Sequence, residues 1–154
     1  KAGIAAVRPT AGRSNLIKGK DLVILDDCYN ANPVSMCAAL DLLAEADTRK
    51  IAILGDMFEL GENEESLHGE VGRYAAKRAI DRILCVGKLS EKMAKEAERE
   101  LRSALSGKSE VRHYAGKEEL LSALGEIIKP GDTVLVKASH GMGFAEIVEK
   151  LKLY

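Results

Sequence analysis

Tryptophan is absent from the 154 residues, and aromatic residues make up only 4% of the chain. Lysine and arginine number 23 against 24 acidic residues, so the net charge is -1. The sequence has no basic stripe with interleaved aromatic residues, which is the usual mark of a nucleic-acid-binding domain. We therefore expect no nucleic acid among its partners.

Long apolar runs are also missing. No stretch approaches the roughly 20 apolar residues that span a bilayer, and the opening segment KAGIAAVRPTAGR lacks the apolar core of a secretory signal. The cysteines, Cys28, Cys37 and Cys85, form an odd set without a C-x-x-C pair, and we interpret them as small buried hydrophobic residues. These absences predict a cytoplasmic protein with no membrane partner.

The common phosphate-binding motifs are incomplete. A P-loop needs G-x-x-x-x-G-K-[ST], but RILCVGKLS has Arg82 in place of the first glycine and Leu89 in place of the hydroxyl residue. In SHGMGFAEI, Glu146 replaces the third glycine of the dinucleotide-binding motif. No metal-ligand spacing relates the histidines, which are His68, His113 and His140. We expect neither a P-loop nor a metal site in this chain.

Short, continuous apolar runs are present, and such runs indicate strands covered on both faces. They are LVIL (22–25), IAIL (51–54), RILCV (82–86) and TVLV (133–136), with VRHYA (111–115) as a weaker candidate. SNLIKGKDLVIL adds a short hairpin strand at the front. Helical periods alternate with the runs. The sequence therefore predicts an α/β fold, a Rossmann-like doubly wound and mostly parallel sheet of about six strands with helices on both faces.

Helix boundaries and buried faces can also be predicted. Asn32 and Pro33 are typical of an N-cap and first helical residue, while Ser90 and Gly107 are typical of the start and stop of a later helix. The expected buried faces are Met36/Ala39/Leu40/Leu43, Leu67/Val71/Tyr74/Arg78, Ala94/Ala97/Leu101/Leu105, Leu120/Leu124/Ile127 and Phe144/Ile147/Val148/Leu151. Only the stem of Arg78 is expected to be buried. We expect one domain over residues 12–154, with residues 1–11 as a linker or the tail of a preceding domain.

Three strand ends carry unusual polar segments: DDCYNANP (26–33), GDMFELGE (55–62) and KASHGMG (137–143). Ligands of open α/β sheets bind outside the carboxyl ends of the strands, so we expect the three segments to meet at one edge of the sheet. Each segment taken alone is also explained by ordinary turn and capping chemistry.

These segments carry a resemblance. DDCYNANPVSMCAAL, LGDMFELGE, His68 and VLVKASHGM resemble the C-terminal domain of the Mur ligases, and AGR (11–13) resembles the segment that enters that domain. The resemblance covers roughly residues 11–153. It is to the members of the family that attach D-alanyl-D-alanine, because the pair YNANP and GDMFELG is specific to them.

The resemblance implies one part of a cytoplasmic, three-domain enzyme of peptidoglycan synthesis. In such an enzyme ATP, with Mg²⁺ held mainly by a central domain, phosphorylates the terminal carboxylate of UDP-MurNAc-tripeptide. The amine of D-alanyl-D-alanine then attacks the acyl phosphate, and an amide, ADP and phosphate are formed. The N-terminal domain holds the UDP-sugar peptide. The isolated C-terminal domain is expected to be inactive, and we assign no catalytic residue in it.

For the nucleotide, the resemblance and the chemistry together point to five residues. Asp27, with Asp26 as the alternative, suits the neighbouring hydroxyls of a ribose. Asn30 and Asn32 suit the edge of the nucleotide, and the alternative role of Asn32 is to cap its helix. Tyr29, which is not one of these five, either stacks on the nucleotide or only packs. Arg13 resembles a family arginine that reaches the ATP phosphates on closure, against the alternative of a solvated linker residue.

For the dipeptide, Lys137, Ser139 and the backbone amides near Gly141 suit a carboxylate at the start of a helix expected near Gly143. The competing view is that Ser139 only caps this helix and Lys137 only pairs with an acid such as Asp56. Asp56 and Glu59 contact the dipeptide or order their loop. His68 can bond the GDMFELG loop or act in function, and His140 stands where many relatives have a more strongly charged or polar residue.

Two other functions are weaker alternatives. A phospho-receiver signalling domain shares the doubly wound sheet, but its acceptor aspartate and its lysine before proline do not match Asp56 and Lys137 in KASH. A nicotinamide-binding module would need the third glycine that Glu146 replaces.

Overall fold

The four continuous apolar runs lie in four strands of one six-stranded sheet, and the predicted fold class is confirmed. The computed structural model describes residues 15–104 and 108–154. The strands are β1 (Asn15–Lys18), β2 (Val23–Asp27), β3 (Lys50–Gly55), β4 (Arg82–Val86), β5 (Glu110–Tyr114) and β6 (Thr133–Lys137). Their order in the sheet is β1-β2-β6-β3-β4-β5. The front hairpin strand β1 is antiparallel to β2, and all other neighbours are parallel.

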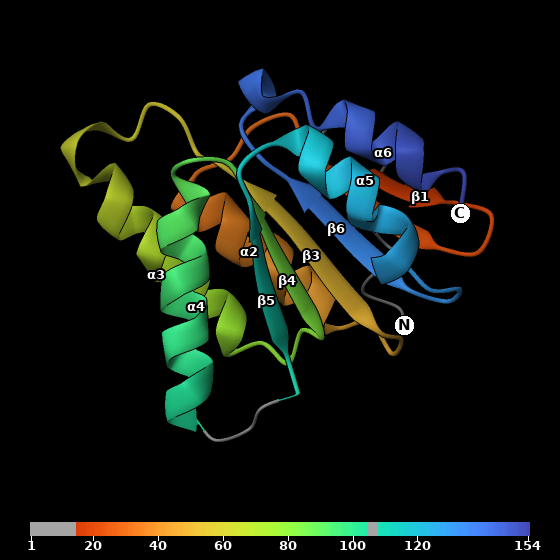
Figure 1. The fold of residues 1–154 in the computed structure, drawn as a ribbon, viewed down its shortest axis with the longest axis horizontal. Helices are drawn as coiled ribbons and strands as arrows, with labels where there is room; N and C mark the ends of the chain where they lie inside the picture. The colour runs from red at the N-terminus through yellow and green to blue at the C-terminus, as the bar shows by residue number, and fades with distance from the viewer. Residues whose placement is uncertain (1–14, 105–107) are drawn as a thin grey trace.

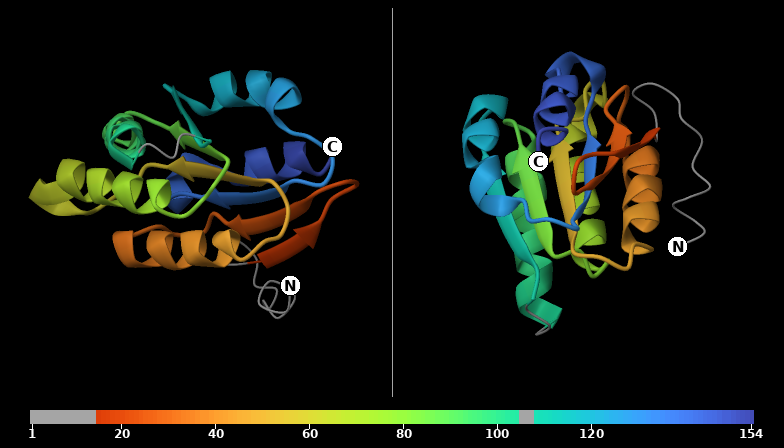
Figure 2. Two further views of the ribbon diagram at one scale, coloured as in Figure 1. Left: turned by 90° about the horizontal axis from the view of Figure 1, so that it is seen from below. Right: turned by 90° about the vertical axis from the view of Figure 1, so that its right-hand side faces the viewer.

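Helices cover both faces of the sheet (Figures 1 and 2). They are α2 (Pro33–Ala44), α3 (Glu64–Ala76), α4 (Ser90–Ala104), α5 (Lys117–Ile127) and α6 (Ala145–Leu151), with short 3₁₀ turns η1 (Gly61–Asn63) and η2 (His140–Met142). In Figure 2, α5 and α6 lie on the side of the sheet opposite α2. Within the described residues no helix is both long and apolar enough to cross a membrane.

The central strands β3, β4 and β6 contribute to two separate cores, which explains why their apolar runs are continuous. In β3, Ile51 and Ile53 belong to the core under α5 and α6, whereas Ala52 and Leu54 belong to the core under α2, α3 and α4. Successive side chains of a strand point to opposite faces, so a strand covered on both sides needs an apolar residue at every position.

The predicted helix starts and most predicted faces are confirmed. Asn32 caps α2: its Oδ1 accepts a hydrogen bond from the Ser35 backbone N–H at 2.8 Å, and Pro33 is the first helical residue. Ser90 begins α4. The expected faces of α2 and α6 are buried in full. The stop expected at Gly107, together with Leu105, lies outside the described residues.

The face predicted for α3 is only partly correct, because Val71 is buried but the buried side is rotated from the predicted one. The helix ends at Ala76. Leu67 and Tyr74 are only half-buried, whereas the buried side consists of His68, Gly69, Val71, Gly72 and Ala75. The reason is close packing of α3 against α4, because a Cβ placed on Gly72 would lie 2.1 Å from the carbonyl oxygen of Met93. Glycines that permit such a close approach do not count as large apolar residues. A face predicted from large apolar residues is therefore displaced from the side of the helix that carries the glycines.

Candidate functional site at the carboxyl edge of the sheet

The three polar segments meet at the carboxyl edge of the sheet, as the sequence predicted. The backbone N–H of Ser139 donates to the carbonyl of Asp56 at 3.0 Å, which joins the ends of β6 and β3. The backbone N–H of Phe58 donates to Ser139 Oγ at 2.8 Å. Lys137 Nζ donates to the carbonyl of Asn30 at 2.9 Å, which joins β6 to the loop after β2.

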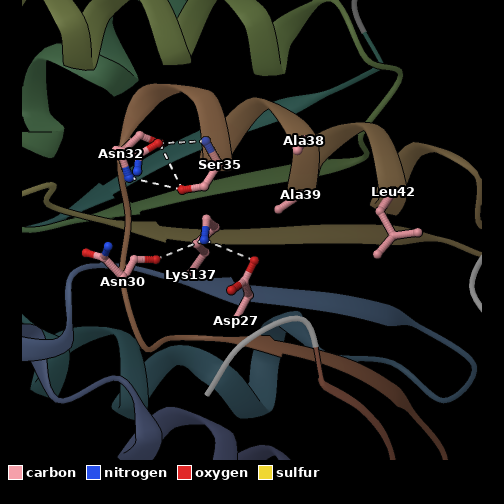
Figure 3. Close-up of a pocket in the computed structure, with 8 residues that line it drawn as sticks. All are labelled: Asp27, Asn30, Asn32, Ser35, Ala38, Ala39, Leu42 and Lys137. Atoms are coloured by element: carbon pink, nitrogen blue, oxygen red, sulfur yellow. Dashed lines mark hydrogen bonds and ion pairs between the residues drawn. The ribbon is translucent and has the colours of Figure 1, made fainter. Parts of the chain in front are cut away.

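A cavity of about 430 Å³ lies at this edge, between the end of β2 and helix α2 (Figure 3). Its volume is within the range of small-molecule sites. The lining residues are Asp27, Asn30, Asn32, Ser35, Ala38, Ala39, Leu42 and Lys137. Four of them were not predicted as site residues. Ser35, Ala38, Ala39 and Leu42 share one side of α2, and the 3.6-residue period after the cap at Asn32 was the signal that could have found them.

The two neighbouring aspartates point to opposite faces of the sheet. Asp27 lines the cavity, and its Oδ2 forms an ion pair with Lys137 Nζ at 3.0 Å. Asp26 lies on the other face, where its Oδ1 accepts a hydrogen bond from the thiol of Cys28 at 2.9 Å. Because consecutive strand residues alternate, one carboxylate at most can face this cavity. The geometry therefore favours Asp27 over Asp26 as the residue that meets a ligand.

The two asparagines of the loop use different groups. Asn30 is exposed, and its carbonyl oxygen is the group that Lys137 holds. Asn32 Oδ1 is occupied by the cap of α2, and the Asn32 backbone N–H donates to Ser35 Oγ at 3.1 Å. For Asn32 the structure thus shows the capping role that the sequence offered as an alternative.

Asp56 lies against the start of helix α4. Its Oδ1 accepts hydrogen bonds from the backbone N–H of Ser90 at 2.8 Å and from Ser90 Oγ at 2.7 Å, and the residue is buried. A carboxylate that satisfies the first amides of a helix is a stabilising N-terminal partner. Of the two roles predicted for Asp56, the geometry favours ordering the loop over contact with the dipeptide.

The segment after β6 differs from the expectations at three points. The helix expected near Gly143 begins at Ala145, and it is only seven residues long. Ser139 forms no side-chain cap to the η2 turn that follows it, because its hydroxyl accepts from Phe58 instead. Lys137 pairs with Asp27 rather than with Asp56 or a free rim position. The helix-dipole and lysine arguments for a carboxylate seat therefore lose their support.

His68 holds the loop after β3. The ring is fully buried, and its Nε2 lies 2.9 Å from the backbone N of Met57, while its Nδ1 lies 2.6 Å from the carbonyl oxygen of Glu64. An amide can only donate and a carbonyl can only accept, so the proton of the neutral ring is on Nδ1. The predicted bond from His68 to the GDMFELG loop is confirmed, and it supports the structural role.

Aromatic side chains stand exposed on the same rim. Tyr29 is 44% exposed and Phe58 is 41% exposed. The ring of Tyr29 contacts that of His140, with 5.6 Å between the centroids and an interplanar angle of 59°. Phe58 was missed by the sequence analysis, since one aromatic residue within a polar loop gives no periodic signal. Next to it, Glu59 has φ of 62°, a left-handed conformation that costs a non-glycine residue energy and concentrates at functional sites.

Two further expectations concern a metal site and Arg13 in the AGR segment (11–13). Across residues 15–104 and 108–154, no group of three or more histidine, cysteine, aspartate or glutamate side chains is placed to hold a metal ion. Arg13, the predicted phosphate contact, lies outside the described residues.

The cysteines provide a test of the packing around this site. Burial, with the bond to Asp26, raises the pKa of Cys28 to about 12, and burial raises the pKa of Cys85 above the usual thiol range. Burial also raises the pKa of Cys37, which is partly exposed. A raised pKa leaves little thiolate at pH 8, and the thiolate is the reactive form. In the native chain, we expect a thiol reagent to label Cys37 slowly and the other two not at all.

This labelling is measured by mass spectrometry before and after addition of guanidinium chloride. The denatured chain should take up label at all three cysteines, and Cys37→Ser should abolish labelling of the native chain. Rapid native labelling of Cys28 would contradict the packing described for the loop after β2.

Taken together, the parallel sheet and the polar cavity at its carboxyl edge define a Rossmann-like α/β domain with a ligand site at the usual place for this class. Residues 12–140 match the family model described as Mur ligase, glutamate ligase domain. The chain belongs to the Mur ligase family.

Particular relatives agree with this assignment. The UDP-N-acetylmuramoyl-tripeptide–D-alanyl-D-alanine ligase of Bacillus subtilis (strain 168) is 40% identical over 97% of this chain, and that of Escherichia coli (strain K12) is 37% identical over 99%. A crystal structure of MurF ligase from Thermotoga maritima in complex with ADP is similar with a TM-score of 0.77 and 25% identity, covering 97% of this chain and 32% of that one. The chain spans 32% of the length of both curated relatives, about a third.

Proposed function

We propose that this chain is the C-terminal domain of an ATP-dependent ligase that joins D-alanyl-D-alanine to UDP-MurNAc-tripeptide in peptidoglycan synthesis. One observation carries the proposal. The segments around Asp27, Asp56 and Ser139, through which the chain resembles the family, are the segments that form the cavity-bearing edge of the sheet. Relatives that are 40% and 37% identical bear the name of this ligase, and none of the relatives described above is a receiver domain.

In the proposed reaction, the terminal carboxylate of the tripeptide attacks the γ-phosphorus of ATP, and ADP leaves. The amine of D-alanyl-D-alanine attacks the resulting acyl phosphate, the amide bond forms, and phosphate leaves as the amine gives up a proton. The domain described here would position two reactants rather than perform bond chemistry, and positioning alone can supply much of a rate enhancement.

We propose that the nucleotide meets the loop after β2. The Asp27 carboxylate can accept hydrogen bonds from the neighbouring ribose hydroxyls, and Asn30 is exposed at the mouth of the same cavity. Tyr29 presents a partly exposed ring beside them. Asn32 would act through the cap that fixes the start of α2 rather than through direct contact. Arg13 is kept as a proposed phosphate contact on the residue pattern alone.

The dipeptide is proposed to meet the loops after β3 and β6. Glu59 is exposed and held in a left-handed conformation, so its carboxylate is available to a positively charged amine. Ser139 links the two loops through Phe58, which gives it an indirect part in shaping this side. Mg²⁺ would accompany ATP and neutralise its phosphates. The described residues do not form a cluster suited to that ion, so we assign it to another domain. We place the reaction in the cytoplasm, which suits the three free cysteines.

The proposal is tested with the full-length polypeptide and with the 154-residue chain alone. The full-length enzyme should release ADP over many turnovers only when both UDP-MurNAc-tripeptide and D-alanyl-D-alanine are supplied. The chain alone should release none, because it lacks a P-loop to hold the phosphates. Tripeptide-dependent ADP release by the isolated chain, or a full-length enzyme indifferent to the dipeptide, would refute the proposal.

A further inference from the structure

Lys137 is the most unusual residue of the cavity, because its charge is almost completely removed from solvent. It is the last residue of β6 and is only 2% exposed. Its Nζ lies 3.0 Å from Asp27 Oδ2 and 2.9 Å from the carbonyl oxygen of Asn30 (Figure 3). The ammonium group is thus directed at two residues of the segment proposed to meet the nucleotide, and both contacts come from outside its own strand.

The contact between Lys137 and Asp27 is set by the sheet itself, since both residues lie in strands. Asp27 and Lys137 are direct partners in the parallel register of β2 and β6, so their side chains leave the sheet on the same face. A buried ammonium is costly unless it is paired and hydrogen-bonded, and the carboxylate and the carbonyl supply those partners. A pair held in this way has little freedom to turn.

We propose that Lys137 is a positioning residue of the nucleotide site and not a ligand of the dipeptide carboxylate. By binding one oxygen of Asp27, it fixes the plane of that carboxylate and hence the direction from which ribose hydroxyls can approach. By binding Asn30, it fixes the loop that forms the mouth of the cavity. Its charge also offsets that of Asp27, so the polyphosphate of a nucleotide meets a neutral pair rather than an isolated carboxylate.

This inference rests on the proposed function, so its test starts from wild-type, full-length enzyme that shows dipeptide-dependent ADP release. If that activity is absent, the proposed function fails and the role of Lys137 at a nucleotide site fails with it. The informative variant is Lys137→Met, which removes the ammonium and keeps an unbranched side chain. Lys150→Met is the matched control, because Lys150 is exposed on α6, away from the cavity.

The readout is the Michaelis constant for each substrate. For Lys137→Met we expect the constant for ATP to rise about tenfold or more, the scale of a lost charge-assisted hydrogen bond, while the constant for D-alanyl-D-alanine stays within about twofold. Lys150→Met should change neither constant. A purely structural role would lower thermal stability and leave both constants of the folded enzyme unchanged, and that outcome would overturn the proposal.

A double variant keeps the test decisive if Lys137→Met folds poorly, because Asp27→Asn with Lys137→Met leaves no unpaired charge in the buried site. If Lys137 acts through Asp27, this double variant should bind ATP no more than about threefold worse than Asp27→Asn alone, since coupled residues are not additive. Additive losses, or a rise confined to the constant for D-alanyl-D-alanine, would refute the positioning role.

Discussion

Asp27→Ala in the full-length ligase is expected to weaken ATP binding by about 1–3 kcal/mol, the range for lost hydrogen bonds to a charged group. Sequence reasoning also predicts that the fold tolerates this change, since a strand-end carboxylate facing a cleft is not core. The structure alters that expectation, because removal of Asp27 leaves the ammonium of Lys137 buried beside it. Loss of one partner of a buried pair costs about 3–5 kcal/mol, so stability should fall as well.

Asp26→Ala is the matched control. It removes a carboxylate one residue away that points to the opposite face and is bonded to Cys28. The Michaelis constant of the Asp26→Ala enzyme for ATP should stay near that of the wild type. The Michaelis constant for ATP and the midpoint of unfolding are measured for both variants on the same preparations. If Asp26→Ala abolishes ATP binding while Asp27→Ala spares it, the two aspartates have been assigned the wrong way round.

A second large effect is expected in the helices, where replacing glycine by alanine should lower the stability at one position and raise it at another. Gly72→Ala in α3 would place a Cβ 2.1 Å from the carbonyl oxygen of Met93. The obstructing atom is backbone and cannot rotate away, so α3 and α4 must separate. Overpacking costs about 1–3 kcal/mol and occasionally more. We expect a loss near the upper end of that range, which lowers the unfolding temperature by roughly 6–12 °C.

Gly125→Ala in α5 is the control. Gly125 is exposed, and a Cβ there would meet only Tyr154 Oη at 3.5 Å, an ordinary contact. Alanine is a better helix former than glycine by up to about 1 kcal/mol, so this variant should be slightly more stable than the wild type. Thermal unfolding of the 154-residue chain measures both variants. Equal stability of Gly72→Ala and the wild type would show that the two helices are not packed as tightly as described.

The central strands were predictable because they are buried on two faces and are apolar at nearly every position, as β3 illustrates. The start of α2 was predictable because Asn32 and Pro33 act locally. The face of α3 was not, since its contact with α4 depends on Gly69 and Gly72, and the absence of a side chain leaves no pattern in the sequence.

The edge of the sheet was predictable as the place of the site, but the partners within it were not. Whether Lys137 meets a substrate, Asp56 or Asp27 depends on which strand lies beside β6, and only the strand order places Asp27 opposite it. Asp56 likewise accepts its hydrogen bond from Ser90, which begins a helix distant in the sequence. Long-range register decides these contacts, whereas single-sequence patterns report local conformation.

The position of β6 in the sheet has a consequence for how the domain is made. β6 is the last of the six described strands to be synthesised, yet it lies between β2 and β3, which do not pair with each other. Until residues 133–137 have left the ribosome, the nascent chain can form only a β1–β2 part and a β3–β4–β5 part, each with an unpaired edge facing the gap. Unpaired edges are templates for association with other chains, and contacts between distant residues form slowly. The strand that carries Lys137 thus joins the two parts of the sheet and also completes the cavity. Until that strand has paired, the nascent domain can associate wrongly with other chains.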